Sequence, residues 1–342
     1  MNPAVLYPLQ PDHPELVAPF AALVRRTGAR RLWMCQSFRA ETHQVLAYLA
    51  GAGHTVPVGT SVTLLALRHP YEAALQARSL ALLTGEPVVA GFGIGDPDFV
   101  AGLTGRPYAS PRTAVRDYLR SVRALLDGEP VAHSGPYHHL HAGLPALGHT
   151  PRVEVAAGVL RPGMARTVGE VADVAVTWMT PPSYMADTLR PALAEGAAGR
   201  ARPPRVATAV HVVVDRPGRD VRRLALAATA GHLRAPHYAA MLRAAGLDLD
   251  EHDPAGTADA LLRHRVVVAG SPAEIAAGLD AYRRAGVDEV VLNPTGVLLG
   301  EGVHAAVADV EDILDACRSF LPDAPQHAAS ASPPESAGHL VG

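Results

Sequence analysis

The strongest constraint on the fold is a regular alternation of short apolar runs with amphipathic stretches of helical spacing. Most of the runs are rich in Val, Ile or Leu and lack strict polar alternation, a pattern typical of strands buried on both faces. The eight runs are Val5–Leu9, Arg31–Cys35, Val56–Leu65, Pro87–Phe92, Val153–Ala157, Val174–Trp178, Val206–Val214 and Val287–Asn293.

The intervening stretches are predicted to form helices. Glu15–Arg26, Tyr71–Leu83 and Thr113–Leu126 each repeat apolar residues at three- and four-residue intervals. Eight strands alternating with helices in one chain of 342 residues favour an α/β fold of the (β/α)8 or TIM-barrel type over an open doubly wound sheet.

Three segments interrupt this rhythm. His133–His141 is predicted to form a small hairpin that turns at Ser134–Pro136, and Ala230–Leu262 is predicted to be a helical insertion. The stretch 322–342 is rich in Pro, Ala and Ser and is predicted to be a disordered tail. We therefore expect one domain over residues 1–321.

Composition excludes several functions. All 30 basic residues are arginine, so no lysine Schiff base can form, and pyridoxal phosphate enzymes and lysine aldolases are excluded. The net charge of −3 without a basic stripe argues against nucleic acid as a partner. No apolar run is long enough for a membrane span, and the N-terminus does not resemble a secretion signal. With only two cysteines, we expect a cytoplasmic protein.

The segment Val88–Gly95, with sequence VVAGFGIG, runs from a strand into alternating glycines. A Rossmann dinucleotide loop is one interpretation, but that loop belongs on a first strand and opens a helix directly. Here Asp96 and Pro97 follow, on about the fourth strand. A strand end whose backbone lies close to a flat ligand, or an ordinary tight turn, are the other interpretations.

The segment Ala156–Met164 lies between a predicted strand and a predicted helix. Small residues at a helix N-terminus leave backbone N–H groups free to bind an anion, and Arg161 could add charge. Barrels often use such loops for phosphate. The segment is therefore predicted to bind phosphate, with an ordinary connecting loop as the alternative.

Other local features allow two interpretations each. His138, His139 and His141 suggest a metal site, but no carboxylate or cysteine is near them in sequence, and we expect no metal. Cys35 is either a nucleophile or a buried structural thiol. Trp178, at a strand end before Met179–Pro182, either stacks on a ring or substrate or packs at the barrel rim.

Several stretches, in this order, resemble the luciferase-like family of flavin and deazaflavin oxidoreductases. They are Arg31–Phe38, Val58–Leu64, Arg68–Pro70, Val88–Gly95, Tyr118–Pro130, Asp173–Thr180 and Gly270–Val291. The WMCQSF and TWMT stretches are most similar to the subgroup that uses coenzyme F420. The resemblance runs from about residue 1 to residue 320.

This resemblance implies a cofactor, F420 or alternatively FMN, whose ring lies across the barrel mouth. It implies a cis peptide at Ser61–Val62 and a phosphate at the loop after the fifth strand. The implied cofactor-binding residues are Ser61, Val62, Gly93, Ile94, Ala157, Gly158, Val159, Leu160, Arg161, Pro162, Gly163 and Met164. A homodimer is the habit of the family.

Two departures from the family pattern affect these implications. The loop GVLRPGM is about two residues longer than usual, and Cys35-Gln36-Ser37 stands where many relatives carry an acidic residue and a histidine. The candidate catalytic residues are then Gln36 and Ser37, as hydrogen-bond donors to ring or substrate, and His43 or His69 as proton donors. Tyr7 is a further proton-donor candidate.

The resemblance implies hydride transfer between reduced F420 and a C=C, C=N or C=O bond of an organic substrate. The apolar and His-rich segments around the expected mouth suggest a bulky, weakly polar small molecule or peptide, such as a natural-product or modified-peptide intermediate. The alternatives are an FMN-dependent monooxygenase, a cofactor-binding relative without catalysis, and an unrelated barrel enzyme.

Overall fold

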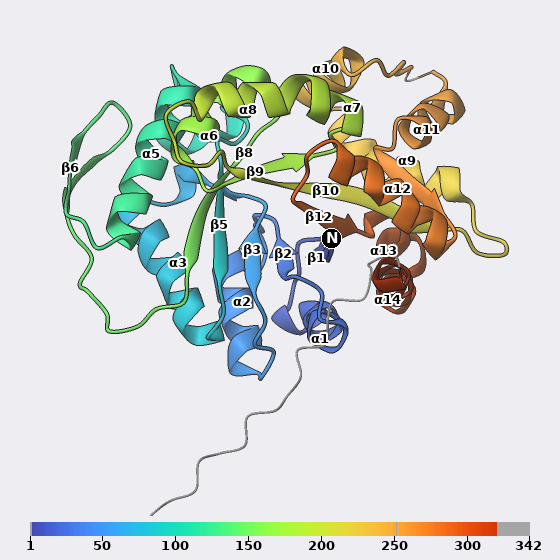
Figure 1. The fold of residues 1–342 in the computed structure, drawn as a ribbon, viewed down its shortest axis with the longest axis horizontal. Helices are drawn as coiled ribbons and strands as arrows, with labels where there is room; N and C mark the ends of the chain where they lie inside the picture. The colour runs from blue at the N-terminus through green and yellow to red at the C-terminus, as the bar shows by residue number, and fades with distance from the viewer. Residues whose placement is uncertain (1, 251, 320–342) are drawn as a thin grey trace, which may run out of the picture.

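The computed structural model describes residues 2–250 and 252–319, and within them eight parallel strands close into a barrel (Figure 1). Pairing of β12 with β1, at Ala4 with Val291, completes the ring. In spatial order the strands are β1 (Ala4–Tyr7), β2 (Leu32–Met34), β3 (Val58–Thr60), β5 (Val88–Gly93), β8 (Val153–Gly158), β9 (Val174–Trp178), β10 (Arg205–Val214) and β12 (Glu289–Asn293). Each predicted run supplies one strand, so the predicted TIM barrel is confirmed.

Helices surround the barrel, and many begin with proline, whose missing N–H costs nothing in a first turn. The helical elements of the described residues are η1 (Pro14–Val17), α1 (Ala18–Thr27), α2 (Thr42–Gly51), η2 (Leu65–Leu67), α3 (Pro70–Thr84), α4 (Pro97–Thr104), α5 (Pro111–Leu126), α6 (Pro162–Val171), α7 (Pro182–Tyr184), η3 (Met185–Leu189), α8 (Arg190–Gly196), α9 (Val221–Leu233), α10 (Pro236–Ala244), α11 (Pro254–Arg263), α12 (Pro272–Arg284), α13 (Thr295–Glu301) and α14 (Val303–Ser319).

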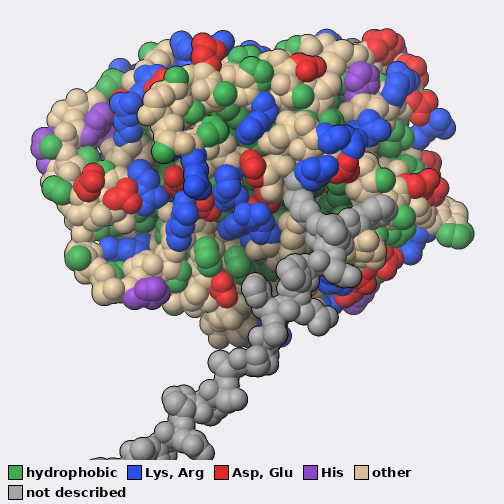
Figure 2. Space-filling model, in the orientation of Figure 1, with side chains coloured by type: hydrophobic (Ala, Val, Ile, Leu, Met, Phe, Trp, Pro, Cys, Tyr) green, Lys and Arg blue, Asp and Glu red, His purple; other side chains and the backbone are tan. Residues whose placement is uncertain are grey.

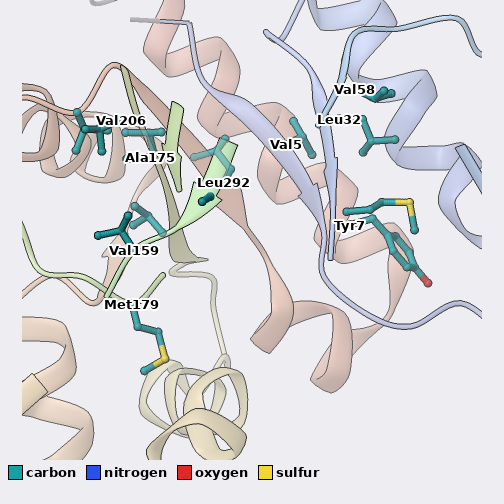
Figure 3. Close-up of a cluster of buried hydrophobic side chains, with 14 of the residues drawn as sticks. Val5, Tyr7, Leu32, Val58, Val159, Ala175, Met179, Val206 and Leu292 are labelled. Atoms are coloured by element: carbon teal, nitrogen blue, oxygen red, sulfur yellow. The ribbon is translucent and has the colours of Figure 1, made fainter. Parts of the chain in front are cut away.

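The strands divide their side chains between two cores because successive residues point to opposite faces. One set points outward and packs under the helices, as Val5, Leu32 and Leu292 do in Figure 3. The other set fills the barrel interior. It comprises Ala4, Leu6, Trp33, Val89, Ala156, Val174, Val176, Ala207, Ala209 and Val291.

A buried ion-pair cluster lies in the barrel interior, at the start of β12. Glu289 is 1% exposed, and its Oε1 accepts hydrogen bonds from Arg31 Nε at 3.0 Å and Trp33 Nε1 at 2.8 Å. Arg30 Nε lies 2.8 Å from the other carboxylate oxygen. Because the strands are parallel, this cluster marks the amino-terminal end of the barrel, opposite the mouth.

The predicted hairpin is confirmed as β6 (Val131–Ser134) and β7 (His139–Ala142), at the left edge of Figure 1. The predicted insertion contains α10 and α11, while α9 begins earlier, at Val221. Two short strands, β4 (Thr63–Leu64) and β11 (Val267–Gly270), add to β5 and β10. The predicted tail, residues 322–342, lies outside the described residues.

Charged side chains of both signs are interspersed on the face shown in Figure 2, with arginines gathered across its middle. Several charged side chains of the surface form ion pairs, as Arg26 does with Glu311 at 2.7 Å. None of the helices in residues 2–250 and 252–319 has the length and apolar character that a membrane crossing requires.

Candidate cofactor and substrate site

At the mouth of the barrel, the extended segment made of β3 and β4 is interrupted at Ser61 and Val62, which lie between the two strands. We call this break the interruption. The peptide bond between them is cis, which confirms the expectation from the sequence. Side chains replace the ladder bonds that are lost here. Thr60 Oγ1 accepts from Gly91 N at 2.8 Å and donates to Gly91 O at 3.0 Å. The backbone of β5 is therefore satisfied beside the interruption without a continuous partner strand.

Val62 occupies the space that glycines on β5 and β8 leave open. A Cβ atom on Gly93 would lie 2.3 Å from Val62 Cγ2, and one on Gly158 would lie 3.7 Å from Val62 Cγ1. A larger residue at position 93 would therefore collide with Val62. Val62, Gly93 and Gly158 form an apolar wall, which we call the glycine wall, and Ile94 is half-buried next to it. Such a surface lets a flat ring approach the backbone closely.

Gln36 and Ser37, the candidates after β2, make local hydrogen bonds. Gln36 N donates to Val62 O at 3.0 Å, and the side-chain Oε1 accepts from Leu64 N at 3.3 Å. Its Nε2 donates to Ser37 O at 2.7 Å. Ser37 is buried, and its Oγ accepts from Arg39 N at 3.2 Å. These bonds leave the Ser37 hydroxyl hydrogen and one hydrogen of Gln36 Nε2 unused, so both side chains keep a donor for a ligand.

Cys35 and Tyr7 lie at the ends of β2 and β1. Cys35 Sγ donates to Ser61 O at 3.2 Å, and burial raises the pKa of the thiol to about 11. The thiol is therefore protonated at neutral pH, which favours a structural role over a nucleophilic one. Tyr7 packs edge-on against Phe20 of α1, with ring centroids 5.4 Å apart, and so points toward the helix layer.

His43 belongs to a charge cluster at the start of α2. Its Nδ1 lies 2.9 Å from Glu41 Oε1, and Arg68 Nη2 lies 3.1 Å from the same oxygen. Burial acts to raise the pKa of Glu41, but the hydrogen bond and charge of His43, with Arg68, bring it down to about 2. His43 is therefore held by a carboxylate that stays ionised at physiological pH.

His69 joins the start of α3 to the hairpin. Its Nδ1 accepts from Tyr71 N at 3.3 Å, which caps the helix, and its Nε2 donates to His139 O at 2.9 Å. Both ring nitrogens are thus engaged in holding backbone groups. These contacts favour a structural position for His69.

The predicted phosphate segment, Ala157–Met164, includes the end of β8, a short loop and the first turn of α6. Among the described residues, no hydrogen bond uses the backbone N–H of Leu160, Arg161 or Gly163. Arg112 of α5 lies against this turn, since a Cβ on Gly163 would be 3.7 Å from Arg112 Cδ. Free amides at a helix N-terminus next to two arginines form a site suited to an anion.

Three polar side chains on β9, β10 and β12 have buried nitrogens without a hydrogen-bond partner among the described residues. They are Trp178 Nε1, both ring nitrogens of His211, and Asn293 Nδ2. We call Trp178, His211 and Asn293 the polar trio. Thr295 N donates to Asn293 Oδ1 at 3.1 Å, so the atom of the Asn293 side chain that lacks a partner is the nitrogen of its NH2 group. Burial lowers the pKa of His211 to about 3, so its ring is neutral.

The strand register brings the polar trio together on the interior side. His211 lies directly opposite Asn293 on the neighbouring strand. Trp178 pairs with Ala209, two residues before His211, and the rings of Trp178 and His211 meet edge-on with centroids 5.9 Å apart. Of the three, only Trp178 was predicted from the sequence as a candidate for contact with a ring or substrate. The sequence signal for His211 and Asn293 was a polar residue at an inward-facing position of a strand that is otherwise apolar.

The helical insertion covers this part of the mouth. The His232 ring, at the end of α9, lies 5.4 Å from the Trp178 ring, and Tyr238 of α10 lies 4.9 Å from His232. Burial raises the pKa of Tyr238, and so does the nearby Cys35. The insertion therefore reaches across the mouth from β9 toward β2.

The hairpin histidines hold one another and nearby serines. The His133 and His138 rings stack with centroids 4.3 Å apart, and His138 Nε2 lies 3.0 Å from Ser121 Oγ. His141 Nε2 lies 3.0 Å from Ser134 Oγ. Within the part of the chain that the structure describes, no three His, Cys, Asp or Glu side chains gather as a metal site.

A closed parallel barrel with its interruption, free amides and polar trio at the carboxyl ends of the strands has the architecture of a (β/α)8-barrel enzyme. The model of the luciferase-like monooxygenase family matches residues 7–289, and the chain belongs to this family.

Comparisons with individual proteins agree with this family. A Mycobacterium tuberculosis protein, assigned by inference as a coenzyme F420-dependent oxidoreductase, is 29% identical over 130 residues, which span 38% of this chain and 36% of that protein. An F420-dependent secondary alcohol dehydrogenase, solved with an F420–acetone adduct, has a TM-score of 0.74 at 18% identity, covering 93% of this chain and 100% of that one.

A third comparison shows that the fold is shared by proteins with a different cofactor. The oxygenating component of 3,6-diketocamphane monooxygenase from Pseudomonas putida, solved with FMN, has a TM-score of 0.68 at 15% identity. The match covers 94% of this chain and 99% of that one. At such identities, both solved structures establish a common fold only.

Proposed function

We propose that this chain is a coenzyme F420-dependent oxidoreductase that transfers a hydride between the reduced deazaflavin and an unsaturated organic substrate. The observation that carries the proposal is the glycine wall, where Val62 sits against Gly93 and Gly158 beside the cis peptide. Membership of the luciferase-like family supports a flavin or deazaflavin cofactor, and the similarity to a protein assigned by inference as F420-dependent favours F420.

The residues of the mouth fit a tricyclic ring with an anionic tail. Val62 fills the space that a Cβ at Gly93 would need, so Ser61, Val62, Gly93 and Ile94 would hold the ring along one apolar surface. The free amides of Ala157–Met164 would hold the phosphate. Arg112, which was not predicted from the sequence, would add a positive charge beside this phosphate.

When bound, reduced F420 supplies a hydride. The chain would contribute orientation, by fixing ring and substrate against opposite sides of the mouth, and exclusion of water by the insertion. Gln36 would hold the interruption in place, and Gln36 Nε2 and Ser37 Oγ would each donate a hydrogen bond to a ring or substrate oxygen. His43, held by Glu41, is our candidate for moving the proton, while His69 would tie the hairpin to α3.

An apolar rim supports a bulky, weakly polar substrate. Phe38, after β2, is 55% exposed, and its ring lies 5.2 Å from that of Phe99 on α4. Both follow the carboxyl ends of their strands and so lie at the mouth. Exposed neighbouring aromatic rings at such a rim are suited to an apolar organic molecule or peptide side chain.

Parallel titrations of the purified chain with F420 and with FMN, followed by fluorescence, test the proposal. We expect micromolar binding of F420 and weak binding of FMN. The likeness to an FMN-bound monooxygenase makes an FMN-dependent monooxygenase the second candidate, and tight FMN binding with no F420 binding would establish it instead.

Two further outcomes are informative. Tight F420 binding without oxidation of reduced F420 by any unsaturated acceptor would point to a non-catalytic cofactor-binding protein. Failure to bind either cofactor would overturn the proposal altogether. The homodimer expected from the family remains a prediction, which light scattering on the same sample tests.

A further inference from the structure

The polar trio is unexplained by the cofactor site. Its members are not surface groups that water can satisfy, because His211 is 1% exposed and Asn293 is fully buried. Buried polar groups in folded proteins nearly always have partners, so each exception needs a reason. The buried nitrogens of Trp178 and His211 and the Nδ2 atom of Asn293 have none within the described residues, and all three side chains lie on the interior side of neighbouring strands.

The position of the trio relative to the glycine wall gives that reason. In the closed strand order, β3, β5 and β8 carry the wall, while β9, β10 and β12 carry the trio. These are opposite halves of one barrel mouth. A ring lying against the wall would face the trio across the mouth, under the cover formed by His232 and Tyr238.

The chemistry of the trio defines what that molecule must present. Trp178 Nε1 and Asn293 Nδ2 can only donate hydrogen bonds, and a neutral imidazole donates one and accepts one. The trio itself carries no cation that would compensate a carboxylate or phosphate, so a neutral oxygen is the matching acceptor. An imidazole can also accept from a hydroxyl, so the same site holds a ketone or the corresponding alcohol.

We propose that Trp178, His211 and Asn293 form the recognition site for a carbonyl oxygen of the substrate, which makes the substrate a ketone, aldehyde or enone. The inference rests on the proposed function, since it takes the ligand of the trio to be the hydride acceptor. The ring of F420 also bears carbonyl oxygens, and the experiment distinguishes these two sources.

The test compares pairs of ligands of similar shape in which the carbonyl oxygen of one is replaced by a CH2 group in the other. Acetophenone with α-methylstyrene, and cyclohexanone with methylenecyclohexane, each pair a C=O group with a C=CH2 group. Binding is measured by ligand-observed NMR on the whole chain, with and without oxidised F420, so that no turnover is needed. The variants are Trp178→Phe and His211→Leu. The control is Tyr48→Phe, which removes a hydrogen-bond donor from the exposed side of α2.

In the native chain we expect at least one ketone to bind about tenfold more tightly than its alkene, which is the discrimination that one buried donor can give. The preference should fall below about threefold in Trp178→Phe and His211→Leu and persist in Tyr48→Phe. Thermal unfolding of each variant confirms that it is folded. The F420 affinity of the variants should change less than twofold.

Three results would overturn the inference. The first is equal affinity for the ketone and the alkene of every pair. The second is a ketone preference that survives both Trp178→Phe and His211→Leu. The third is a loss of F420 affinity in these variants while the ketone preference is retained. The last would assign the trio to the ring. If F420 does not bind but the ketone preference depends on the trio, the site stands and the proposed function fails.

Discussion

The indole of Trp178 meets the imidazole of His211 edge-on, with ring centroids 5.9 Å apart and an interplanar angle of 90°. Trp178 is followed by Met179, whose φ of 54° lies in the left-handed region that few residues other than glycine adopt. This turn buries Met179 in the outer core and leaves Trp178 on the interior side. The position of the indole is therefore set by the backbone as well as by packing.

The neutral state of His211 predicts a pH dependence of stability. Its pKa is lowered to about 3 by burial and by His232, against about 6.5 in an unfolded chain. Between these values only the unfolded state binds the proton, so stability falls as the pH falls below about 6.5. His211→Leu should therefore gain about 2 kcal/mol relative to the native chain between pH 7 and pH 5. Urea unfolding at both pH values measures this, and a constant difference would contradict it.

Gly93→Ala should damage the glycine wall. The new Cβ would lie 2.3 Å from Val62 Cγ2, so the interruption must shift. We expect a loss of about 1–3 kcal/mol in stability and at least tenfold weaker F420 binding. Gly102→Ala is the matched control, because its Cβ meets nothing within 4 Å on α4. Unaltered F420 affinity in Gly93→Ala would show that the ring lies elsewhere.

Glu289→Gln should destabilise the barrel without a direct effect at the mouth. The carboxylate is the shared partner of Arg31, Trp33 and Arg30, and removing its charge leaves the buried Arg31 guanidinium uncompensated. Breaking such a buried pair costs about 3–5 kcal/mol. Glu311→Gln, which breaks an exposed pair with Arg26, should cost less than about 1 kcal/mol. Denaturant unfolding compares the two.

Arg112→Ala should weaken F420 binding, because this side chain lies against the helix turn proposed to hold the phosphate. A lost charge-assisted contact of about 1.5 kcal/mol corresponds to roughly tenfold. Arg116→Ala, one turn further along α5 and paired with Glu170, is the control. Titration at low and high salt should show the larger effect at low salt. Equal effects of the two variants would place the anion elsewhere.

Cys35 should be chemically inert in the folded chain. Burial raises the pKa of both Cys35 and Cys317 to about 11, and the thiolate is the reactive species. Ellman's reagent at pH 8 should therefore react slowly with the folded protein and quickly with both thiols in urea. Rapid release of one equivalent from the folded protein would restore Cys35 as a candidate nucleophile.

The fold was predictable because buried parallel strands leave a strong apolar signal. Every predicted run became a strand of the barrel, and the run Val56–Leu65 also contains β4, whereas β11 was not predicted. Asp96, which follows the glycines of β5, caps α4 by accepting hydrogen bonds from Asp98 N and Phe99 N.

The site was predictable only where a pattern is local in sequence. The cis peptide and the glycines of β5 lie in short segments that resemble the family, and the structure brings them together. The trio could not be assembled from the sequence, because Trp178, His211 and Asn293 are far apart and meet only through the register of three strands. Likewise, Gln36 and His69 are typical hydrogen-bonding residues whose contacts only the packing reveals.

The pairing of β11 with β10 has a consequence for how this chain can change over evolutionary time. The excursion that carries the cover of the mouth leaves β10 at Val214 and returns at Val267, which pairs with His211 of the same strand. Both of its ends are thus fixed on β10. Residues gained or lost within it would alter the shape of the opening while barrel closure stayed intact, so length variation there offers related chains a route to new specificities.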